Sequence, residues 1–193
     1  MRILFIGSVK FSESLLKKLI LNGSNIIGII ALSTKKYNSD YCDLIPLALE
    51  NNISSISVED VNSDNSINWI KEKKPDIIFC FGWSRILKKG LLSIPKIGVI
   101  GYHPSLLPNN RGRHPIIWSL VLGLQETGST FFIMDEGVDS GDIISQRVVP
   151  ISFDDTALTL YKKLELIAAD QLLELLPSIS NRTFKRIKPE FKF

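Results

Sequence analysis

Residues 2–31 have the sequence RILFIGSVKFSESLLKKLILNGSNIIGIIA, which begins and ends with a short apolar run. The two apolar runs, residues 2–6 and 25–31, are predicted to be strands. Between them, apolar side chains recur at helical spacing, with Ser12 as the expected N-cap and Gly23 just after the last turn. A strand, a helix and a second strand form the repeating unit of a parallel sheet.

The same alternation continues along the chain. Further strands are expected at residues 53–58, 76–81, 97–103, 130–135 and 143–149, and further helices at 44–51, 67–74, 115–123 and from a cap at Asp154 or Asp155 to about 176. Polar loops are expected at 32–43 and 104–114. We therefore predict an α/β fold over residues 1–180, with a Rossmann-like, doubly wound, mostly parallel sheet and helices on both faces. Residues 181–193 form a basic tail without a clear pattern.

Composition argues against several classes of partner. The 23 basic and 20 acidic residues give a net charge of +3 and are spread along the chain, so no nucleic-acid partner is expected. Two cysteines are too few for a disulfide framework, and Cys80, within an apolar run, is expected to be a buried thiol. No apolar run approaches a membrane span or a signal peptide. We expect a cytoplasmic protein without a membrane partner.

The loop after the first strand, residues 7–12, lacks the three glycines of a dinucleotide-binding turn, so no nicotinamide or flavin is expected. A helix N-terminus with Lys10 nearby could hold a phosphate or carboxylate of a substrate, and the same residues could equally form an ordinary start of a helix. The two histidines, His103 and His114, have no carboxylate or thiol at metal-ligand spacing, and no metal site is predicted.

Both histidines lie in one block, residues 99–146, which reads VIGYHPSLLPNNRGRHPIIWSLVLGLQETGSTFFIMDEGVDSGDIISQ. His103 stands where a strand enters a long polar loop, a position more typical of function than of a core histidine. An acid-rich loop, residues 135–142, follows a predicted helix and strand. Because such sheets bind ligands beyond the carboxyl ends of their strands, a base and a carboxylate could meet there.

Several motifs of this block carry a family resemblance: HPSLLP (103–108), RG (111–112), Pro115, Trp118, Gly123, TG (127–128) and VDSGD (138–142). They resemble the signature of formyltransferases that use N10-formyltetrahydrofolate. This family includes glycinamide ribonucleotide transformylase, methionyl-tRNA formyltransferase and the sugar N-formyltransferases. The likeness is specific in this block and co-linear from Met1 to about Val149, which implies that residues 1–180 are a formyltransferase catalytic domain.

The resemblance implies His103 and Asp139 as catalytic residues, although composition alone leaves Asp135, Glu136 and Asp142 as competitors for the acid. N10-formyltetrahydrofolate is the implied formyl donor. Its expected contacts come from the loop after the fourth strand and from the acid-rich loop: Trp83, Ser84, Arg85, Ile86, Leu87, Met134, Asp135, Glu136, Gly137 and Val138. Expected contacts with the acceptor come from the first loop and the segment around His103: Ser8, Val9, Lys10, Tyr102, Asn109, Asn110 and Arg111.

One position departs from the family pattern, because Gly101 stands where the family has a catalytic asparagine. Attack of an amine on the formyl carbon produces an oxyanion, and the loss of one oxyanion donor typically costs about 2.7 to 4 kcal/mol of barrier. Three replacements are considered: a backbone N–H near Gly101, an ordered water in the space of the missing side chain, or the amide of Asn109 or Asn110. His103 is expected to stabilise the oxyanion, while Asp139 orients the imidazole and helps to remove the amine proton.

The strings RGRHPIIW and FFIMDEGVDSGDI are most similar to the sugar N-formyltransferases, with a pseudaminic-acid type as the suggested branch. The implied acceptor is an amino sugar of surface-glycan biosynthesis, nucleotide-linked or free, and a homodimer is the candidate assembly. Methionyl-tRNA is disfavoured, because those enzymes carry a further C-terminal domain and this chain has modest charge. Alternatives are a glycinamide ribonucleotide transformylase, a non-catalytic folate-binding module, and an unrelated doubly wound nucleotide-binding protein.

Overall fold

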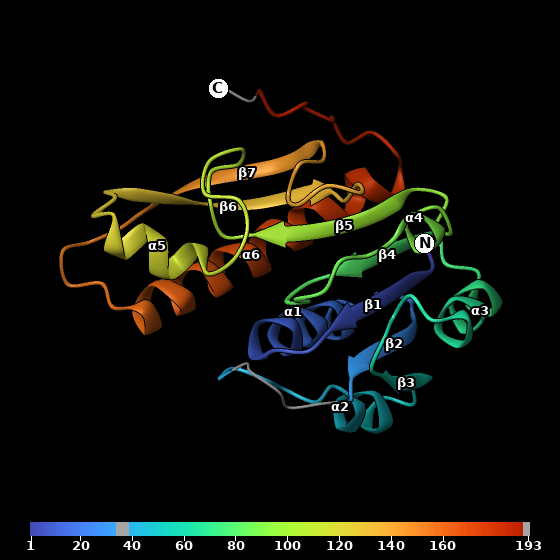
Figure 1. Ribbon diagram of the computed structural model, residues 1–193. Helices are drawn as coiled ribbons and strands as arrows, with labels where there is room; N and C mark the ends of the chain where they lie inside the picture. Colours follow the sequence, from blue (N-terminus) through green and yellow to red (C-terminus); the bar gives the residue numbers. More distant parts are fainter. Residues whose placement is uncertain (34–38, 191–193) are drawn as a thin grey trace. The chain divides into compact units, whose positions relative to one another are not determined.

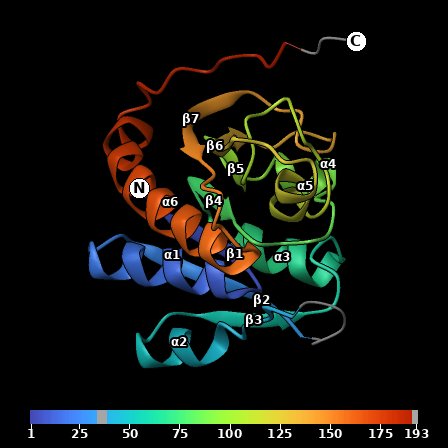
Figure 2. The same ribbon diagram turned by 90° about the vertical axis from the view of Figure 1, so that its left-hand side faces the viewer.

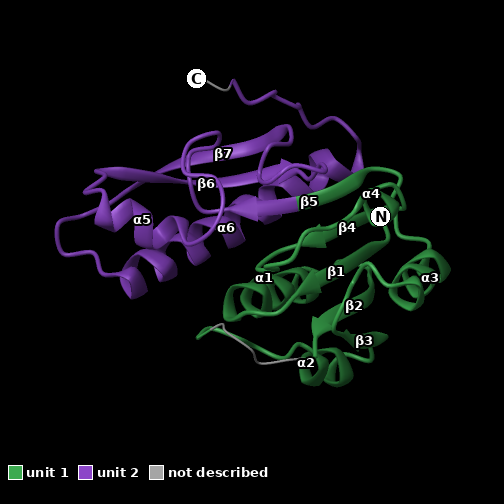
Figure 3. Ribbon diagram, in the orientation of Figure 1, with its two compact units in different colours: residues 1–100 green, residues 101–193 purple. Residues whose placement is uncertain are grey.

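The computed structural model describes residues 1–33 and 39–190, so part of the expected 32–43 loop and the last tail residues lie outside the described residues. The described strands form one sheet of order β3-β2-β1-β4-β5-β6-β7 (Figure 1). The predicted α/β fold with a mostly parallel sheet is confirmed. The chain divides into two compact units, residues 1–100 and 101–193, and the division falls inside β5 (Gly98–His103) (Figure 3).

The first unit is a parallel sheet with helices on both faces. Its elements are β1 (Ile3–Gly7), α1 (Lys10–Leu21), β2 (Ile26–Leu32), α2 (Ile45–Glu50), β3 (Ser55–Val58), α3 (Asp64–Lys73), β4 (Ile77–Cys80) and α4 (Lys89–Leu92). Strand β1 pairs in parallel with β2 and β4, and β2 with β3. Figure 2 shows α1 and α2 along one face of these strands and α3 along the other. Every residue of β1 and β4 is buried, as expected for strands covered on both faces, and Cys80 is a buried free thiol.

The first helix begins three residues earlier than expected, so the prediction of Ser12 as its N-cap is wrong. Val9 holds the cap position with extended backbone, and the Ser12 hydroxyl accepts from the amides of Ser8 and Val9, each at 3.3 Å. Ser12 also donates to the carbonyl of Phe81 at 2.6 Å. A hydroxyl in the first turn can fold back onto the free amides before it. Here the same hydroxyl also ties the loop after β1 to the end of β4.

The second unit holds the end of β5 together with α5 (Pro115–Val121), β6 (Glu126–Ile133), β7 (Ile143–Pro150) and α6 (Ala157–Ser180). Strands β6 and β7 are antiparallel, and their pairing from Glu126 extends β6 beyond the expected 130–135. Helix α5 packs against the first half of α6 in a small apolar cluster (Figure 1). In the tail, Ile187 forms an antiparallel bridge with Ile143, with N–H···O distances of 2.8 and 2.9 Å. The tail therefore has a fixed backbone contact that its composition did not indicate.

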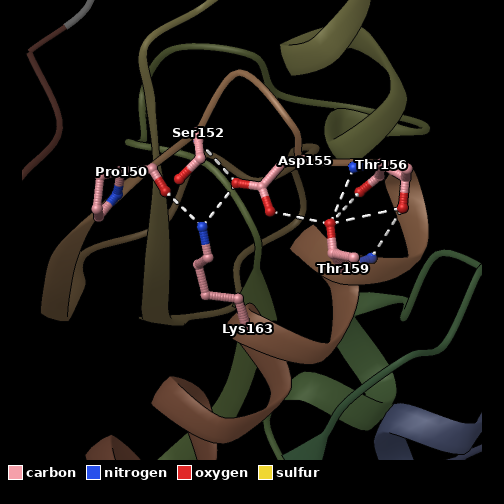
Figure 4. Close-up of polar contacts among 6 residues, drawn as sticks. All are labelled: Pro150, Ser152, Asp155, Thr156, Thr159 and Lys163. Atoms are coloured by element: carbon pink, nitrogen blue, oxygen red, sulfur yellow. Dashed lines mark hydrogen bonds and ion pairs between the residues drawn. The ribbon is translucent and has the colours of Figure 1, made fainter.

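Helix α6 is capped by Thr156, not by Asp154 or Asp155 as expected. The Thr156 hydroxyl accepts from the Thr159 amide at 3.2 Å. Asp155 instead closes the preceding turn, because its carboxylate accepts from the Ser152 amide at 2.7 Å, from Lys163 at 2.6 Å and from the Thr159 hydroxyl at 2.9 Å (Figure 4). Lys163 also donates to the Pro150 carbonyl at 3.1 Å. These bonds, above all that from Lys163, lower the pKa of Asp155 to about 2.

This shift predicts a pH-dependent contribution of Asp155 to stability. Since its folded pKa lies below the unfolded value of about 3.9, the ionised carboxylate stabilises the fold above that value and loses its effect as the pH falls toward about 2. Asp155→Asn should therefore unfold at lower urea concentration than the wild type at neutral pH, with a gap that narrows as the pH falls below about 4. Asp154→Asn, on an exposed neighbour, is the control. A gap of equal size at every pH would contradict this assignment.

Candidate active site

The two residues predicted to be catalytic lie together in the second unit. His103 ends β5 and is 5% exposed. Its Nδ1 lies 3.4 Å from Oδ2 of Asp139, and its Nε2 lies 2.8 Å from the backbone carbonyl oxygen of Asn110. The imidazole therefore stands between two acceptors, a carboxylate and a carbonyl, and it can donate to both only when both ring nitrogens carry a hydrogen.

Asp139 joins two loops through one carboxylate oxygen. Its Oδ2, besides facing His103, accepts from the backbone N–H of Gly112 at 2.9 Å. Its backbone has φ of +50°, a left-handed conformation that aspartate and asparagine tolerate better than most side chains. Asp135, an alternative for the catalytic acid, has other partners: its Oδ1 accepts from the Gly137 amide at 3.0 Å and from the Ser140 hydroxyl at 2.7 Å. Asp139 therefore contacts the imidazole, whereas these contacts of Asp135 lie within its own loop.

The segment that follows His103, residues 104–110, is held against β6 and β7 by side chains that the sequence did not single out for this purpose. Its carbonyl groups accept from three side chains: Pro104 from Thr127 at 3.1 Å, Ser105 from Thr130 at 2.6 Å and Leu107 from Gln146 at 3.0 Å. The polar residues of β6 and β7 form contiguous runs, residues 126–130 and 145–147, without the alternation of a half-buried strand. The pattern therefore did not indicate which of these side chains bind the loop.

Gly128 explains how closely this segment can approach the sheet. A Cβ added there would lie 2.6 Å from the carbonyl carbon and oxygen of Ser105. The loop backbone thus rests directly on the glycine, with Thr127 before it in β6. The motif Thr127–Gly128, quoted above as part of the family signature, is a signal that could have located this contact.

The position of the family's asparagine is filled by apolar groups. A Cβ added at Gly101 would lie 2.9 Å from both Met134 Cγ and Phe132 Cζ. Phe132 belongs to a buried cluster with Leu107 and Ile143, and Met134 packs against it. This packing leaves no room beside Gly101 for the ordered water considered as a replacement. It also places Met134, expected to contact the folate, partly in the core of the second unit.

The residues near His103 that were expected to contact the acceptor lie in different environments. Asn110, with φ of +52°, presents an acceptor to His103 through its backbone, and Asn109 uses its own carbonyl to accept from Ser105 at 2.7 Å. Arg111 is exposed. Tyr102 alternates with His103 along β5 and so points to the opposite face, where its ring lies 5.1 Å from that of Phe131. Burial raises the pKa of Tyr102, and the structure does not bring this side chain to the imidazole.

The remaining predicted residues lie in the first unit, where the loop after β1 adjoins the loop after β4. The Ser8 hydroxyl donates to the carbonyl of Gly82 at 3.1 Å. Gly82 has φ of +62°, and a Cβ there would lie 2.2 Å from Val9 Cγ2, so this turn requires glycine. Lys10 is exposed. The first loop and the expected folate loop are thus neighbours at the carboxyl ends of adjacent strands.

Within residues 83–87 the side chains have different environments. Trp83 Nε1 is buried and has no hydrogen-bond partner among the described residues. Ser84, Arg85 and Ile86 are exposed, and the Arg85 guanidinium donates to the carbonyl of Glu59. Leu87 is buried at 2% exposure. In the acid-rich loop, the expected folate contacts Asp135, Glu136, Gly137 and Val138 are all exposed.

The described part of the chain has neither a cluster of metal-ligand side chains nor a helix suited to span a membrane. Residues 1–33 and 39–190 hold no group of three or more histidine, cysteine, aspartate or glutamate side chains arranged to bind a metal ion. None of the helices in these ranges has the length and apolar character needed to cross a bilayer.

The filled space at Gly101 predicts that restoring the family's asparagine destabilises this chain. Gly101→Asn should lower the free energy of unfolding by about 1–3 kcal/mol, the usual cost of overpacking. The additional change Phe132→Leu should recover part of this loss, which urea unfolding of the four variants of the cycle would measure. Gly90→Asn is a matched control, because the nearest atom to an added Cβ there is 3.7 Å away. Wild-type stability of Gly101→Asn would contradict the packing described.

Comparison with known proteins places this fold and site in a family. The model of the formyl transferase family matches residues 1–176. The methionyl-tRNA formyltransferase of Caldanaerobacter subterraneus subsp. tengcongensis is 33% identical over 184 residues, which are 93% of this chain and 60% of that protein. That of Kosmotoga olearia is 37% identical over 185 residues, or 93% of this chain and 59% of that protein. The chain thus spans about 60% of the length of these curated relatives.

Solved structures show the same fold at lower identity. Phosphoribosylglycinamide formyltransferase from Bacillus halodurans aligns with a TM-score of 0.80 and 22% identity, over 96% of this chain and all of that one. The N-formyltransferase from Helicobacter canadensis, in complex with folinic acid and dTDP-3-aminofucose, gives 0.74 and 22%, over 97% of this chain and 67% of that one. Because the family model covers nearly all of the sequence, the chain belongs to the formyl transferase family.

Proposed function

We propose that this protein transfers a formyl group from N10-formyltetrahydrofolate to the amine of an amino sugar. The observation that carries the proposal is the buried His103 between the Asp139 carboxylate and the Asn110 carbonyl, in a chain of the formyl transferase family. When its ring is protonated, His103 is a cation beside the Asp139 carboxylate, so the pair can present both charges. Formyl transfer needs both, one for a developing oxyanion and one for the proton of the amine.

The residues of the expected folate loops fit such a donor. The unpartnered Trp83 Nε1–H can donate to the polar edge of a flat heterocycle. Ile86, exposed by 64%, offers apolar surface in the same loop that a ligand ring could cover. When bound, the donor supplies an activated formyl carbon and a tetrahydrofolate leaving group.

The chain's own groups then act on the acceptor amine. As the amine nitrogen bonds to the formyl carbon, the imidazolium of His103 stabilises the negative charge that develops on the formyl oxygen. The proton released by the amine passes to the Asp139 carboxylate and from the pair to the departing nitrogen, whose bond to the formyl carbon breaks. Gly112 N–H keeps the carboxylate oriented throughout. A backbone N–H near Gly101 or the side-chain amide of Asn109 or Asn110 remains the proposed second oxyanion donor.

An amino sugar is the favoured acceptor because the RGRHPIIW and FFIMDEGVDSGDI strings are most similar to the sugar N-formyltransferases. The likeness to the structure from Helicobacter canadensis, which was determined with an amino sugar nucleotide, is consistent with this choice. A pseudaminic-acid-type acceptor, a role in surface-glycan biosynthesis, a cytoplasmic location and a homodimer belong to the same proposal.

Methionyl-tRNA is the second candidate acceptor. The observation that favours it is the 33% to 37% identity to two methionyl-tRNA formyltransferases, against the expectation drawn from their further C-terminal domain and from the modest charge of this chain. A glycinamide ribonucleotide acceptor is consistent with the full overlap with the Bacillus halodurans structure.

One assay separates these acceptors. The purified chain is given N10-formyltetrahydrofolate with nucleotide-linked amino sugars, nonulosonic acids, glycinamide ribonucleotide or methionyl-tRNA, and tetrahydrofolate release is measured. We expect turnover with an amino sugar. Turnover confined to methionyl-tRNA or glycinamide ribonucleotide would overturn the choice of acceptor. Folate binding without turnover on any amine would favour a non-catalytic binding module.

The catalytic roles predict the effect of two isosteric changes. His103→Asn and Asp139→Asn should each lower kcat at least about tenfold, because each removes one partner of the histidine–aspartate pair. Asparagine at 139 tolerates the left-handed backbone, so the fold should survive, as circular dichroism would verify. His114→Asn, also at a left-handed position, is the control for loss of a histidine. Near-wild-type kcat in either catalytic variant would remove the assignment.

A further inference from the structure

Gln146 connects β7 to the segment that follows His103. Its Nε2 donates to the carbonyl of Leu107 and to the Thr130 hydroxyl, both at 3.0 Å. Because the Leu107 carbonyl is purely an acceptor, the amide must present its NH₂ group to this segment. Gln146 is an exposed residue, so its role is not to fill the core.

From Leu107 the chain needs three residues to return to the imidazole. The Asn109 amide donates to the Leu106 carbonyl at 2.9 Å, and the Asn109 carbonyl accepts from Ser105. The next carbonyl, that of Asn110, lies 2.8 Å from His103 Nε2. The bond from Gln146 therefore fixes the middle of a short turn whose end contacts the imidazole.

The Asn110 carbonyl favours a hydrogen on Nε2 of the ring. A carbonyl accepts and does not donate, so Nε2 must be protonated for this contact to be a hydrogen bond. Asp139 Oδ2, 3.4 Å from Nδ1, is also an acceptor, so in the neutral ring the two acceptors compete for the single ring hydrogen. A displaced Asn110 carbonyl would leave the carboxylate as the remaining acceptor beside the ring and move the hydrogen toward Nδ1.

We propose that Gln146 is a positioning residue for the catalytic histidine: it anchors the Leu107 carbonyl and so keeps the Asn110 carbonyl on Nε2 of His103. The expected effect on kcat rests on the proposed formyl transfer, while the expected effect on the imidazole tautomer does not. Replacement of Gln146 should change the populations of the two neutral imidazole tautomers without unfolding the chain.

The direct test is nitrogen NMR of the chain labelled with ¹⁵N-histidine, in a His114→Asn background so that His103 gives the one imidazole signal set. At a pH where the ring is neutral, we expect the Asn110 carbonyl to maintain a population of the Nε2-protonated tautomer in the presence of Gln146. Gln146→Leu should shift these signals toward the Nδ1-protonated tautomer. Unchanged signals in a folded Gln146→Leu protein would overturn the proposal.

Two further variants separate the hydrogen bond from side-chain shape. Gln146→Glu keeps the length but presents two acceptors to the Leu107 carbonyl, so it should disturb the tautomer at least as much as leucine; wild-type signals there would overturn the proposal. Arg147→Ala, which removes the neighbouring side chain and its contact with Glu174, is the control and should leave the signals unchanged. A shift as large in Arg147→Ala would assign the effect to β7 in general and overturn the role of Gln146.

Kinetics give the second readout once an acceptor is found. Gln146→Leu should lower kcat by on the order of ten- to a hundredfold, as small misplacements of catalytic groups do, with little change in the KM of the folate donor. An unchanged kcat would overturn the catalytic consequence. If the wild type accepts no amine, the proposed function fails, and the NMR comparison still decides whether Gln146 sets the tautomer.

Discussion

The candidate site depends on the two acceptors that flank one buried imidazole. His103 is fixed at the end of β5, and its ring nitrogens face the carbonyl of Asn110 at 2.8 Å and the carboxylate of Asp139 at 3.4 Å. Each acceptor belongs to a different loop, and Asp139 also binds the amide of Gly112. The loops after β5 and β6 are thereby tied to the same ring. The ring therefore has an acceptor beside each of its nitrogens, a carbonyl at Nε2 and a carboxylate at Nδ1.

The second constraint is the apolar filling at Gly101. The side chain of the family's asparagine would enter space that Phe132 and Met134 occupy, so the packing of this unit excludes it. The backbone of residues 104–110, which delivers the Asn110 carbonyl, is held independently by hydrogen bonds from Thr127, Thr130 and Gln146.

The fold class could be predicted from the sequence, whereas the pairing of His103 with Asp139 rested on the family resemblance, because composition alone left Asp135, Glu136 and Asp142 open. Apolar runs mark buried parallel strands, and a histidine where such a strand meets a long loop is visible in one sequence. Gln146 and Thr130 could not be found, because the carbonyl groups that they bind, those of residues 107 and 105, become known as partners only when the loop after β5 is placed. The same holds for Ser12, whose hydroxyl bonds to Phe81, a partner 69 residues away. The packing at Gly101 required the register of β6, which contains an irregularity between Phe131 and Phe132.

The central claim is that His103 and Asp139 move a formyl group from a folate onto an amine. It is tested most directly by following a ¹³C label in the formyl group of N10-formyltetrahydrofolate by NMR, in the presence of the chain and an amino sugar. The account predicts that the label appears as an N-formyl amide of the sugar, with loss of the donor signal at the same rate. Label that stays on the donor, or that is released as formate equally fast with and without the amine, would contradict it.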